Sequence, residues 1–266
     1  VSKNKAINIL EDLVIHPKVH PQHYLIHKYW GRKPHNLISE YLRILTKEND
    51  TVLDPFMGSG GVVIESNKLK RNSIGVDINP MSVMIVSETL KKVDLIKLEN
   101  TFQKILEELP EDIKNLQQVE RNGEVCVIEN AVWVGDKLKR VKINYKGKSI
   151  RRNANKVDLE KNETAKKLLK KYKNEISYST DQIMRYVKRN QKEYINELFS
   201  DRNILIAGWF LKKFENLTDK EVSESLKFIF TSALPNFSKM IPGDLEKVIG
   251  KSGWQISKFW APEIHA

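Results

Sequence analysis

The sequence predicts an α/β fold in its N-terminal part, followed by a mostly helical region that carries a basic β-hairpin. Three observations predict this arrangement. Two short apolar runs end in Asp54 and Asp77, a glycine-rich turn and a helix-forming stretch separate them, and Lys/Arg residues concentrate between positions 137 and 192. A strand, a turn, a helix and a second strand in this order make a βαβ unit, whose parallel strands need a crossover helix.

The strands of this unit are short and apolar, as buried parallel strands are. The first is predicted at residues 51–53 and the second at residues 73–76. Residues 62–69 form the predicted crossover helix. A further helix is predicted at residues 79–90, because it opens with an Asn-Pro pair and proline suits the first turn of a helix.

Two helical patterns and a loop precede the βαβ unit. Residues 3–14 predict a short amphipathic helix, and residues 36–45 return to helical spacing of their apolar side chains. Pro17 and Pro21 interrupt any helix between them, so residues 15–35 are predicted to form an extended loop.

The pattern changes twice downstream of the βαβ unit. Residues 94–118 predict helix, whereas the runs 125–128 and 139–143 flank a Gly-Asp pair and predict a β-hairpin. A basic loop is expected at residues 146–156, and mostly helical structure at residues 159–240.

The charge of the chain is strongly localised. The chain has 266 residues, 40% of them hydrophobic, and a net charge of +11. Between Lys137 and Lys192 there are 19 Lys/Arg residues against 5 Asp/Glu residues, so this block carries +14 and the remainder −3. A basic block on a near-neutral body indicates a polyanionic partner such as nucleic acid. Charge alone leaves open the alternative of a solvated lysine-rich surface.

Several classes of protein and site are excluded. No apolar stretch approaches the ~20 residues that span a bilayer, and no signal-peptide pattern opens the chain. We therefore expect a cytoplasmic protein without a membrane partner. The single Cys126 excludes a disulfide framework and a multi-cysteine metal site. Prolines interrupt the four histidines between positions 16 and 27, which are expected to be solvated rather than bound to zinc.

The sharpest chemical signal is the turn Asp54-Pro55-Phe56-Met57-Gly58-Ser59-Gly60. Glycines let the backbone approach a ligand closely, and the following helix presents N–H groups to polar atoms. Asp77 is placed to hydrogen-bond ribose hydroxyls. The third glycine of the dinucleotide fingerprint is missing, and no Lys-Ser or Lys-Thr follows as in a P-loop. The glycine pattern alone leaves a purely structural turn open.

Three segments together resemble the bacterial DNA adenine/cytosine amino-methyltransferases. They are His27-Lys28-Tyr29-Trp30-Gly31-Arg32-Lys33-Pro34-His35-Asn36-Leu37-Ile38, Asp50-Thr51-Val52-Leu53 with the turn that follows it, and Gly75-Val76-Asp77-Ile78-Asn79-Pro80. The resemblance covers about residues 25–90, and the Tyr-Trp-Gly-Arg-Lys-Pro wording is similar to a subgroup of large DNA methylases. It implies part of a Rossmann-like methyltransferase sheet that binds S-adenosylmethionine.

The resemblance also implies which residues hold this cofactor. The methionine and ribose side would be lined by Asp54, Phe56, Gly58, Ser59 and Gly60. Asp77 would bind the ribose hydroxyls and Ile78 would lie against the adenine. The methionine end would be closed by Trp30, Lys33 and Pro34. Gly61 stands where the family usually has threonine, so that hydroxyl contact is absent.

No catalytic residue can be assigned in this chain. The family uses an Asp/Asn-Pro-Pro-Tyr/Phe segment to hold the amino group and stack on the flipped base, and this chain has no Pro-Pro dipeptide. A C5-cytosine mechanism needs a cysteine nucleophile, but Cys126 lies between two valines of a predicted strand and is expected to be buried. We expect a truncated chain, or a second chain that supplies the missing segment, and no turnover by this chain alone.

The expected function is therefore the cofactor-binding part of a restriction-modification DNA methyltransferase. Its target would be the exocyclic amine of adenine (N6), favoured over that of cytosine (N4). A non-catalytic S-adenosylmethionine-binding or DNA-binding subunit and an RNA methyltransferase fragment remain as alternatives. The cofactor-binding core is expected at residues 1–92, a helical insertion that contacts DNA at 93–240, and an irregular tail at 241–266.

Overall fold

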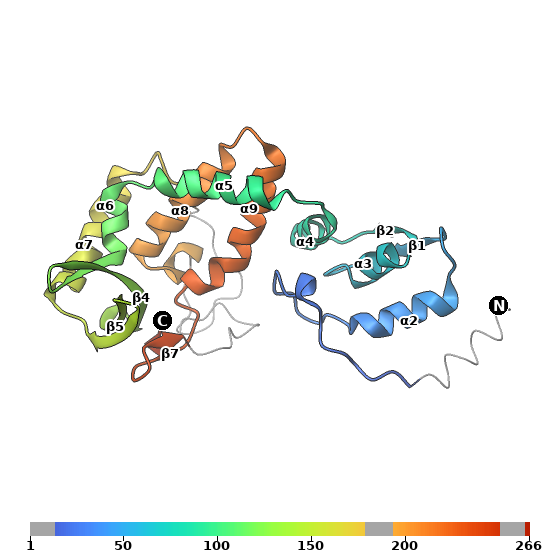
Figure 1. Cartoon of the computed structure of the whole chain (residues 1–266), viewed down its shortest axis with the longest axis horizontal. Coiled ribbons are helices and arrows are strands. Elements are labelled where there is room, and N and C mark those ends of the chain that lie inside the picture. Colours follow the sequence, from blue (N-terminus) through green and yellow to red (C-terminus); the bar gives the residue numbers. More distant parts are fainter. Residues whose placement is uncertain (1–13, 179–193, 251–263) are drawn as a thin grey trace. The chain divides into compact units, whose positions relative to one another are not determined.

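The computed structural model describes residues 14–178, 194–250 and 264–266, which belong to two compact units, residues 1–94 and residues 95–266 (Figure 1). The helix predicted at residues 3–14 lies almost wholly outside the described residues, as does most of the tail. No helix in the described ranges is long and apolar enough to cross a bilayer.

The N-terminal unit contains a parallel pair of strands with helices, and the predicted α/β class is confirmed for it. Its elements are η1 (Gln22–Tyr24), α2 (His35–Leu45), β1 (Thr51–Asp54), α3 (Gly61–Lys68), β2 (Asn72–Gly75) and α4 (Pro80–Leu90). The register runs from Thr51 opposite Asn72 to Asp54 opposite Gly75. The four predictions for residues 36–45, 51–53, 62–69 and 73–76 are each confirmed to within about one residue.

Local chemistry explains where α4 begins. The side chain of Asn79 accepts a hydrogen bond from the N–H of Met81 at 3.0 Å, and Pro80 occupies the first turn. Helix α4 then packs on α3, where Val63 and Val86 form a buried apolar cluster with Met57. The helix predicted at residues 79–90 is confirmed.

The two strands present unequal faces. Leu53, Ile74 and Val76 are more than half exposed, at 61%, 54% and 52%, whereas their neighbours Val52 and Ser73 are half-buried. Parallel sheets are normally covered on both faces. The exposed apolar side chains therefore mark a face to which further structure can be added.

The C-terminal unit combines helices with an antiparallel sheet. Its helical elements are α5 (Leu95–Glu107), α6 (Glu111–Lys114), η2 (Asn115–Gln117), α7 (Lys156–Lys171), η3 (Ile195–Leu198), α8 (Asp201–Glu215), α9 (Lys220–Ala233) and η4 (Leu234–Phe237). Helix α9 contacts both α5 and α8 (Figure 1). Trp209 and Leu205 of α8 are almost completely buried, which makes this helix the centre of the helical part.

The sheet of this unit is a meander in the order β3-β4-β5-β6. Its strands are β3 (Gln118–Arg121), β4 (Glu124–Val134), β5 (Lys137–Tyr145) and β6 (Lys148–Asn153), and β9 (Ile264–His265) pairs with β4. A separate short pair is formed by β7 (Gly243–Asp244) and β8 (Ile249–Gly250). Cys126 is buried in the core of the sheet, as the sequence predicted.

The prediction of a basic loop at residues 146–156 is wrong. Residues Lys148–Asn153 form β6, and Lys156 already begins α7. The reversal between β5 and β6 is a two-residue turn at Lys146 and Gly147, with φ of 51° and 75°. Positive φ at both central residues is the geometry of type I′ hairpin turns.

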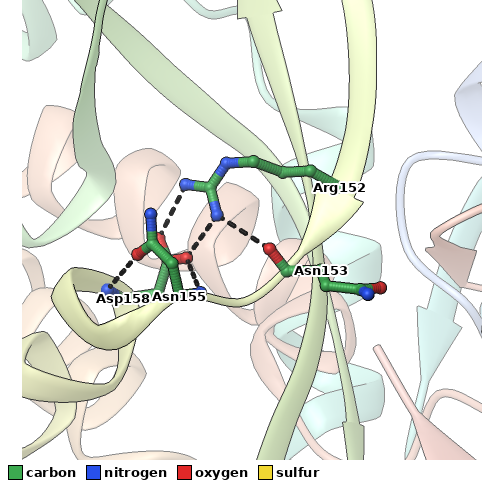
Figure 2. Close-up of polar contacts among 4 residues, drawn as sticks. All are labelled: Arg152, Asn153, Asn155 and Asp158. Carbon is green, nitrogen blue, oxygen red and sulfur yellow. Dashed lines mark hydrogen bonds and ion pairs between the residues drawn. The ribbon is translucent and has the colours of Figure 1, made fainter.

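A buried ion pair joins β6 to the start of α7 (Figure 2). The guanidinium of Arg152 donates to both carboxylate oxygens of Asp158, at 2.5 and 3.0 Å, and also to the carbonyl of Asn153. The same carboxylate accepts the N–H of Asn155, whose side chain in turn accepts the N–H of Asp158. Asp158 is fully buried, so one side chain serves as ion-pair partner and helix cap together.

We expect Asp158→Ala to destabilise the C-terminal unit by about 3 kcal/mol, because it leaves Arg152 without its partner and removes the half of the capping box that accepts the Asn155 N–H. Urea unfolding followed by hydrogen exchange of α7 measures this loss. The matched control is Glu163→Ala on the same helix, whose pair with Lys166 is exposed and should contribute less than about 1 kcal/mol. Equal losses for the two variants would contradict the assignment.

Candidate functional site

The turn between β1 and α3 is held by backbone hydrogen bonds. The N–H of Met57 donates to the carbonyl of Val76 at 3.0 Å, and the N–H of Gly60 donates to Met57 at 2.7 Å. Gly58 and Gly60 both adopt left-handed conformations, with φ of 51° and 74°. The chain therefore bends sharply at the carboxyl end of β1, the edge at which open α/β sheets bind ligands.

Asp77 links this turn to the segment after β2. One carboxylate oxygen accepts the N–H of Gly58 at 2.8 Å, and the other accepts the N–H of Asn79 at 2.8 Å. The hydrogen bonds from Asn79 and Gly58 hold the pKa of Asp77 below its ordinary value. Asp77 is consequently ionised at neutral pH and still has acceptor positions left, since an ionised carboxylate offers about four.

The outer side of the site exposes two large apolar side chains. Phe56 is 87% exposed and Ile78 is 100% exposed, and each lies just beyond the end of a strand. Asp54, at the end of β1, accepts the N–H of Phe56 at 3.1 Å, and Ser59 is buried. Large apolar groups that are left in water at the end of a parallel sheet are available to contact a ligand.

The structure gives the glycines a role that does not depend on a ligand. The sequence interpretation assigned them to close approach of a ligand, but a Cβ at Gly60 would lie 2.2 Å from Val86 Cγ2, and one at Gly58 would lie 3.2 Å from the ring of Tyr29. Both positions are also in the left-handed region that favours glycine. Packing within the protein and backbone conformation therefore suffice to require these two glycines.

The segment before α2 reaches the same turn through residues that the sequence interpretation missed. The Nε of Arg32 donates to Ser59 Oγ of the turn at 3.1 Å. The ring of Tyr29 lies beside Gly58 of the turn, and its hydroxyl accepts a hydrogen bond from Ser82 of α4 at 3.2 Å. Tyr29 and Arg32 both belong to the Tyr-Trp-Gly-Arg-Lys-Pro segment, and this motif was the sequence signal that could have identified them. Of the residues predicted there, Trp30 is 43% exposed and Pro34 precedes the first residue of α2.

Lys33 is exposed, and the structure gives it no contact with the turn. The remaining predicted residues, from Asp54 to Gly60 and at positions 77 and 78, follow the ends of β1 and β2. The Asp77 carboxylate brings the two groups together directly. The N-cap of α3 is Gly60, so no side chain caps the first N–H groups of that helix.

Glu65 on α3 anchors the N-terminal segment from beneath. This buried carboxylate accepts hydrogen bonds from Tyr24 Oη at 2.8 Å, from Lys68 Nζ at 2.7 Å and from the hydroxyl of Ser39. Burial raises the pKa of Glu65, but the hydrogen bonds from Lys68, Ser39 and Tyr24 outweigh it and lower the pKa overall. The segment is therefore tied to the helix that follows the glycine turn.

The histidines of this segment pack around an aromatic ring. The rings of His20, His23 and His35 lie within 6.0 Å of the ring of Tyr24, measured between centroids. Burial lowers the pKa of His20 and of His23. Across residues 14–178, 194–250 and 264–266, no group of three or more His, Cys, Asp or Glu side chains is arranged to hold a metal ion.

The N-terminal unit is similar in sequence to known DNA methyltransferases. The model of the DNA methylase family, which covers N6 and N4 methyltransferases, matches residues 3–88. Type II methyltransferase M.MjaII of Methanocaldococcus jannaschii is 35% identical over 91 residues, which are 34% of this chain and 17% of that protein. Type II methyltransferase M1.MboII of Moraxella bovis is 41% identical over 63 residues, 24% of each chain.

A third relative, type II methyltransferase M.BsoBI of Geobacillus stearothermophilus, is 33% identical over 92 residues, which are 32% of this chain and 18% of that protein. The chain thus spans no more than about a quarter of the length of these three relatives. No solved structure matches it. Type II methyltransferases of this family use S-adenosylmethionine as methyl donor.

We expect Gly60→Ala to destabilise the N-terminal unit by about 3 kcal/mol, because the new methyl group adds a clash with Val86 to an unfavourable φ. Gly31→Ala is the matched control, since Gly31 has φ of 71° but no atom within 4 Å of an added Cβ. That variant should lose only about 1 kcal/mol. Hydrogen exchange of β1 and α3 in urea measures both, and similar losses would refute the packing role.

We expect Glu65→Gln to destabilise the N-terminal unit by about 2 kcal/mol at pH 7, since the charged acceptor is lost. The folded pKa of Glu65 lies below its unfolded value of about 4.3, so its stabilisation is present above that pH and is lost as the pH falls through the folded pKa. The difference between wild type and variant should therefore shrink below about pH 4.

The same urea titration, repeated between pH 7 and pH 3, tests this dependence. Glu40→Gln is the control, because the pair of Glu40 with Arg43 is exposed and should contribute under about 1 kcal/mol. A difference for Glu65→Gln that stays constant over this range would show that the carboxylate charge is not what anchors the segment.

Proposed function

We propose that this chain, whose residues 3–88 match the model of the DNA methylase family, is the S-adenosylmethionine-binding part of a DNA amino-methyltransferase. The observation that carries the proposal is the linked pair of loops at the ends of β1 and β2. Asp77 fixes the two loops to each other and leaves Phe56 and Ile78 exposed beside them.

Each part of the cofactor has a chemically suitable partner at this site. The remaining acceptor positions of Asp77 suit ribose hydroxyls, which donate hydrogen bonds. Phe56 would contact the methionine and ribose side of the cofactor and Ile78 the adenine, and burying such a side chain is worth roughly 1.5–3 kcal/mol. The N–H groups at the start of α3 and the cation of Lys33 suit the methionine carboxylate.

Trp30 and Pro34 would close the methionine end of the site. Arg32 positions their segment through its hydrogen bond to Ser59, so the segment and the turn are held together without the ligand. Asp54 fixes the start of the turn by accepting the N–H of Phe56. Bound S-adenosylmethionine would supply an electrophilic methyl group for in-line attack by a positioned exocyclic amine.

The acceptor side of the reaction needs a further segment. The chain has no Asp/Asn-Pro-Pro-aromatic sequence to accept hydrogen bonds from the amino group. The exposed face formed by Leu53, Ile74 and Val76 is where helices of a larger methyltransferase sheet would pack. Adenine N6 is the favoured target, and the chain alone is expected to be inactive. The same absence supports the second candidate, a cofactor-binding subunit without chemistry of its own.

We expect Phe56→Ala to weaken S-adenosylmethionine binding at least tenfold, because Phe56 has almost no intramolecular packing to lose and acts only through the ligand. Isothermal titration calorimetry with S-adenosylmethionine measures the change. Leu45→Ala is the matched control, since Leu45 of α2 is also an exposed apolar residue of this unit and should leave binding unchanged. Undetectable binding by the folded wild-type chain would overturn the proposed function.

A further inference from the structure

We propose that the exposed face of α7, continued by the start of β5, is a phosphate-binding track for the DNA backbone. The lysine track consists of Lys137, Lys139, Lys156, Lys166, Lys167, Lys170 and Lys173. The proposal rests on the proposed function for the kind of polyanion, DNA, and it assigns that partner to a surface of the C-terminal unit.

Helix α7 is strongly two-sided. Asp158, Ala165 and Leu168 are buried, and Tyr172, just past its end, is buried as well. At 100° per residue these four positions lie within one third of the helix circumference. The α7 lysines of the track lie on the opposite side and are exposed, and Lys173 continues that side one turn beyond Lys170.

The positive charge of this face is only partly balanced. Glu160 and Glu163 share the face, at 3.7 Å from Lys156 and 2.9 Å from Lys166. The structure shows no ion pair for Lys167, Lys170 or Lys173. Three like charges spaced three residues apart repel one another slightly, so this arrangement favours an anionic partner.

The track continues from the helix to the sheet. A hollow of about 860 Å³ is lined by residues of α7, by the β4–β5 turn and by the start of α8. Lys137 and Lys139 line it on the side of β5, and Lys156 and Lys166 line it on the side of α7. Asp136, Glu160, Glu163 and Asp201 line the hollow as well. Lysines from two separate elements thus converge on one concavity, in which carboxylates balance part of their charge.

The dimensions suit a nucleic-acid backbone. The 16 residues of α7 extend over about 24 Å, which is roughly two thirds of the 34–36 Å turn of B-DNA. Lysine side chains offer point charges on flexible stems, which bind phosphates without reading base edges. The track therefore positions a duplex and does not select its sequence.

The alternative partner for a basic amphipathic helix is an anionic membrane surface, which needs an apolar face to insert. The apolar face of α7 is already buried within the unit, by Ala165 and Leu168 among others. Val157 and Leu159 are about half exposed, but they lie 200° apart around the helix and form no continuous apolar face. The accessible surface is otherwise mostly charged, so the structure favours DNA over a lipid surface.

The test measures binding of the whole 266-residue chain to a fluorescein-labelled 30-base-pair duplex by fluorescence anisotropy, at 50–200 mM NaCl. We expect the triple variant Lys167→Gln/Lys170→Gln/Lys173→Gln to bind at least tenfold more weakly at about 100 mM salt. The slope of log K against log salt should become shallower by about 2.7, since each lost phosphate contact removes about 0.9. The charge-preserving variant Lys167→Arg/Lys170→Arg/Lys173→Arg should bind the duplex within about threefold of wild type.

The matched control is Lys47→Gln/Lys104→Gln/Lys220→Gln, which removes the same charge from exposed lysines outside the track. An equal loss in this control, or an unchanged slope in the track variant, would overturn the proposal, as would binding to phosphatidylserine vesicles in preference to the duplex. S-adenosylmethionine titration of the track variant separates this proposal from the proposed function. If the track variant still binds S-adenosylmethionine but no longer binds the duplex, the lysine track is supported. If the wild-type chain binds the duplex but not S-adenosylmethionine, only the proposed function is refuted.

Discussion

The candidate cofactor site depends on the two hydrogen bonds that the carboxylate of Asp77 accepts. Its two oxygens accept backbone N–H groups from Gly58 and Asn79, so a single side chain fixes the loops that follow both strands. Because β1 and β2 are parallel, these loops leave the same edge of the sheet. A turn that is held from within leaves Phe56 and Ile78 free to face outward. Such a site is ordered before any ligand binds, which lowers the entropic penalty of binding.

Helix α3 supports this site from two directions. Its N-terminus follows the glycine turn directly, and its Glu65 accepts hydrogen bonds from Tyr24 of the N-terminal segment and from Ser39 of α2. Arg32 of that segment then returns to Ser59 in the turn. The turn, the helix and the segment thus form a closed set of polar contacts, in which each element is positioned by the other two.

In the C-terminal unit, some charged side chains stabilise the fold and others are exposed to solvent. Arg152 and Asp158 are used within the fold, where they join β6 to α7 and cap the helix (Figure 2). The α7 lysines of the track lie on the opposite side of the same helix and are exposed. One helix can therefore combine a fixed orientation with a surface suited to a polyanion, because its buried face determines the first property and its exposed face the second.

The sequence by itself determined the elements whose signals are local. The apolar runs, the Asn79-Pro80 pair and the glycine turn predicted β1, α3, β2 and α4, because strand and helix periodicity and the preference of proline for a first helical turn act within a few residues. It did not predict β6, although the Lys146-Gly147 turn preceded it, since a strand with three basic residues among six is stabilised by its neighbour and not by its own composition. Only the tertiary structure decided that Val86 fills the space beside Gly60 and that Glu65 is the anchor of the N-terminal segment. Both depend on contacts between residues far apart in the chain, and no local pattern encodes such distances.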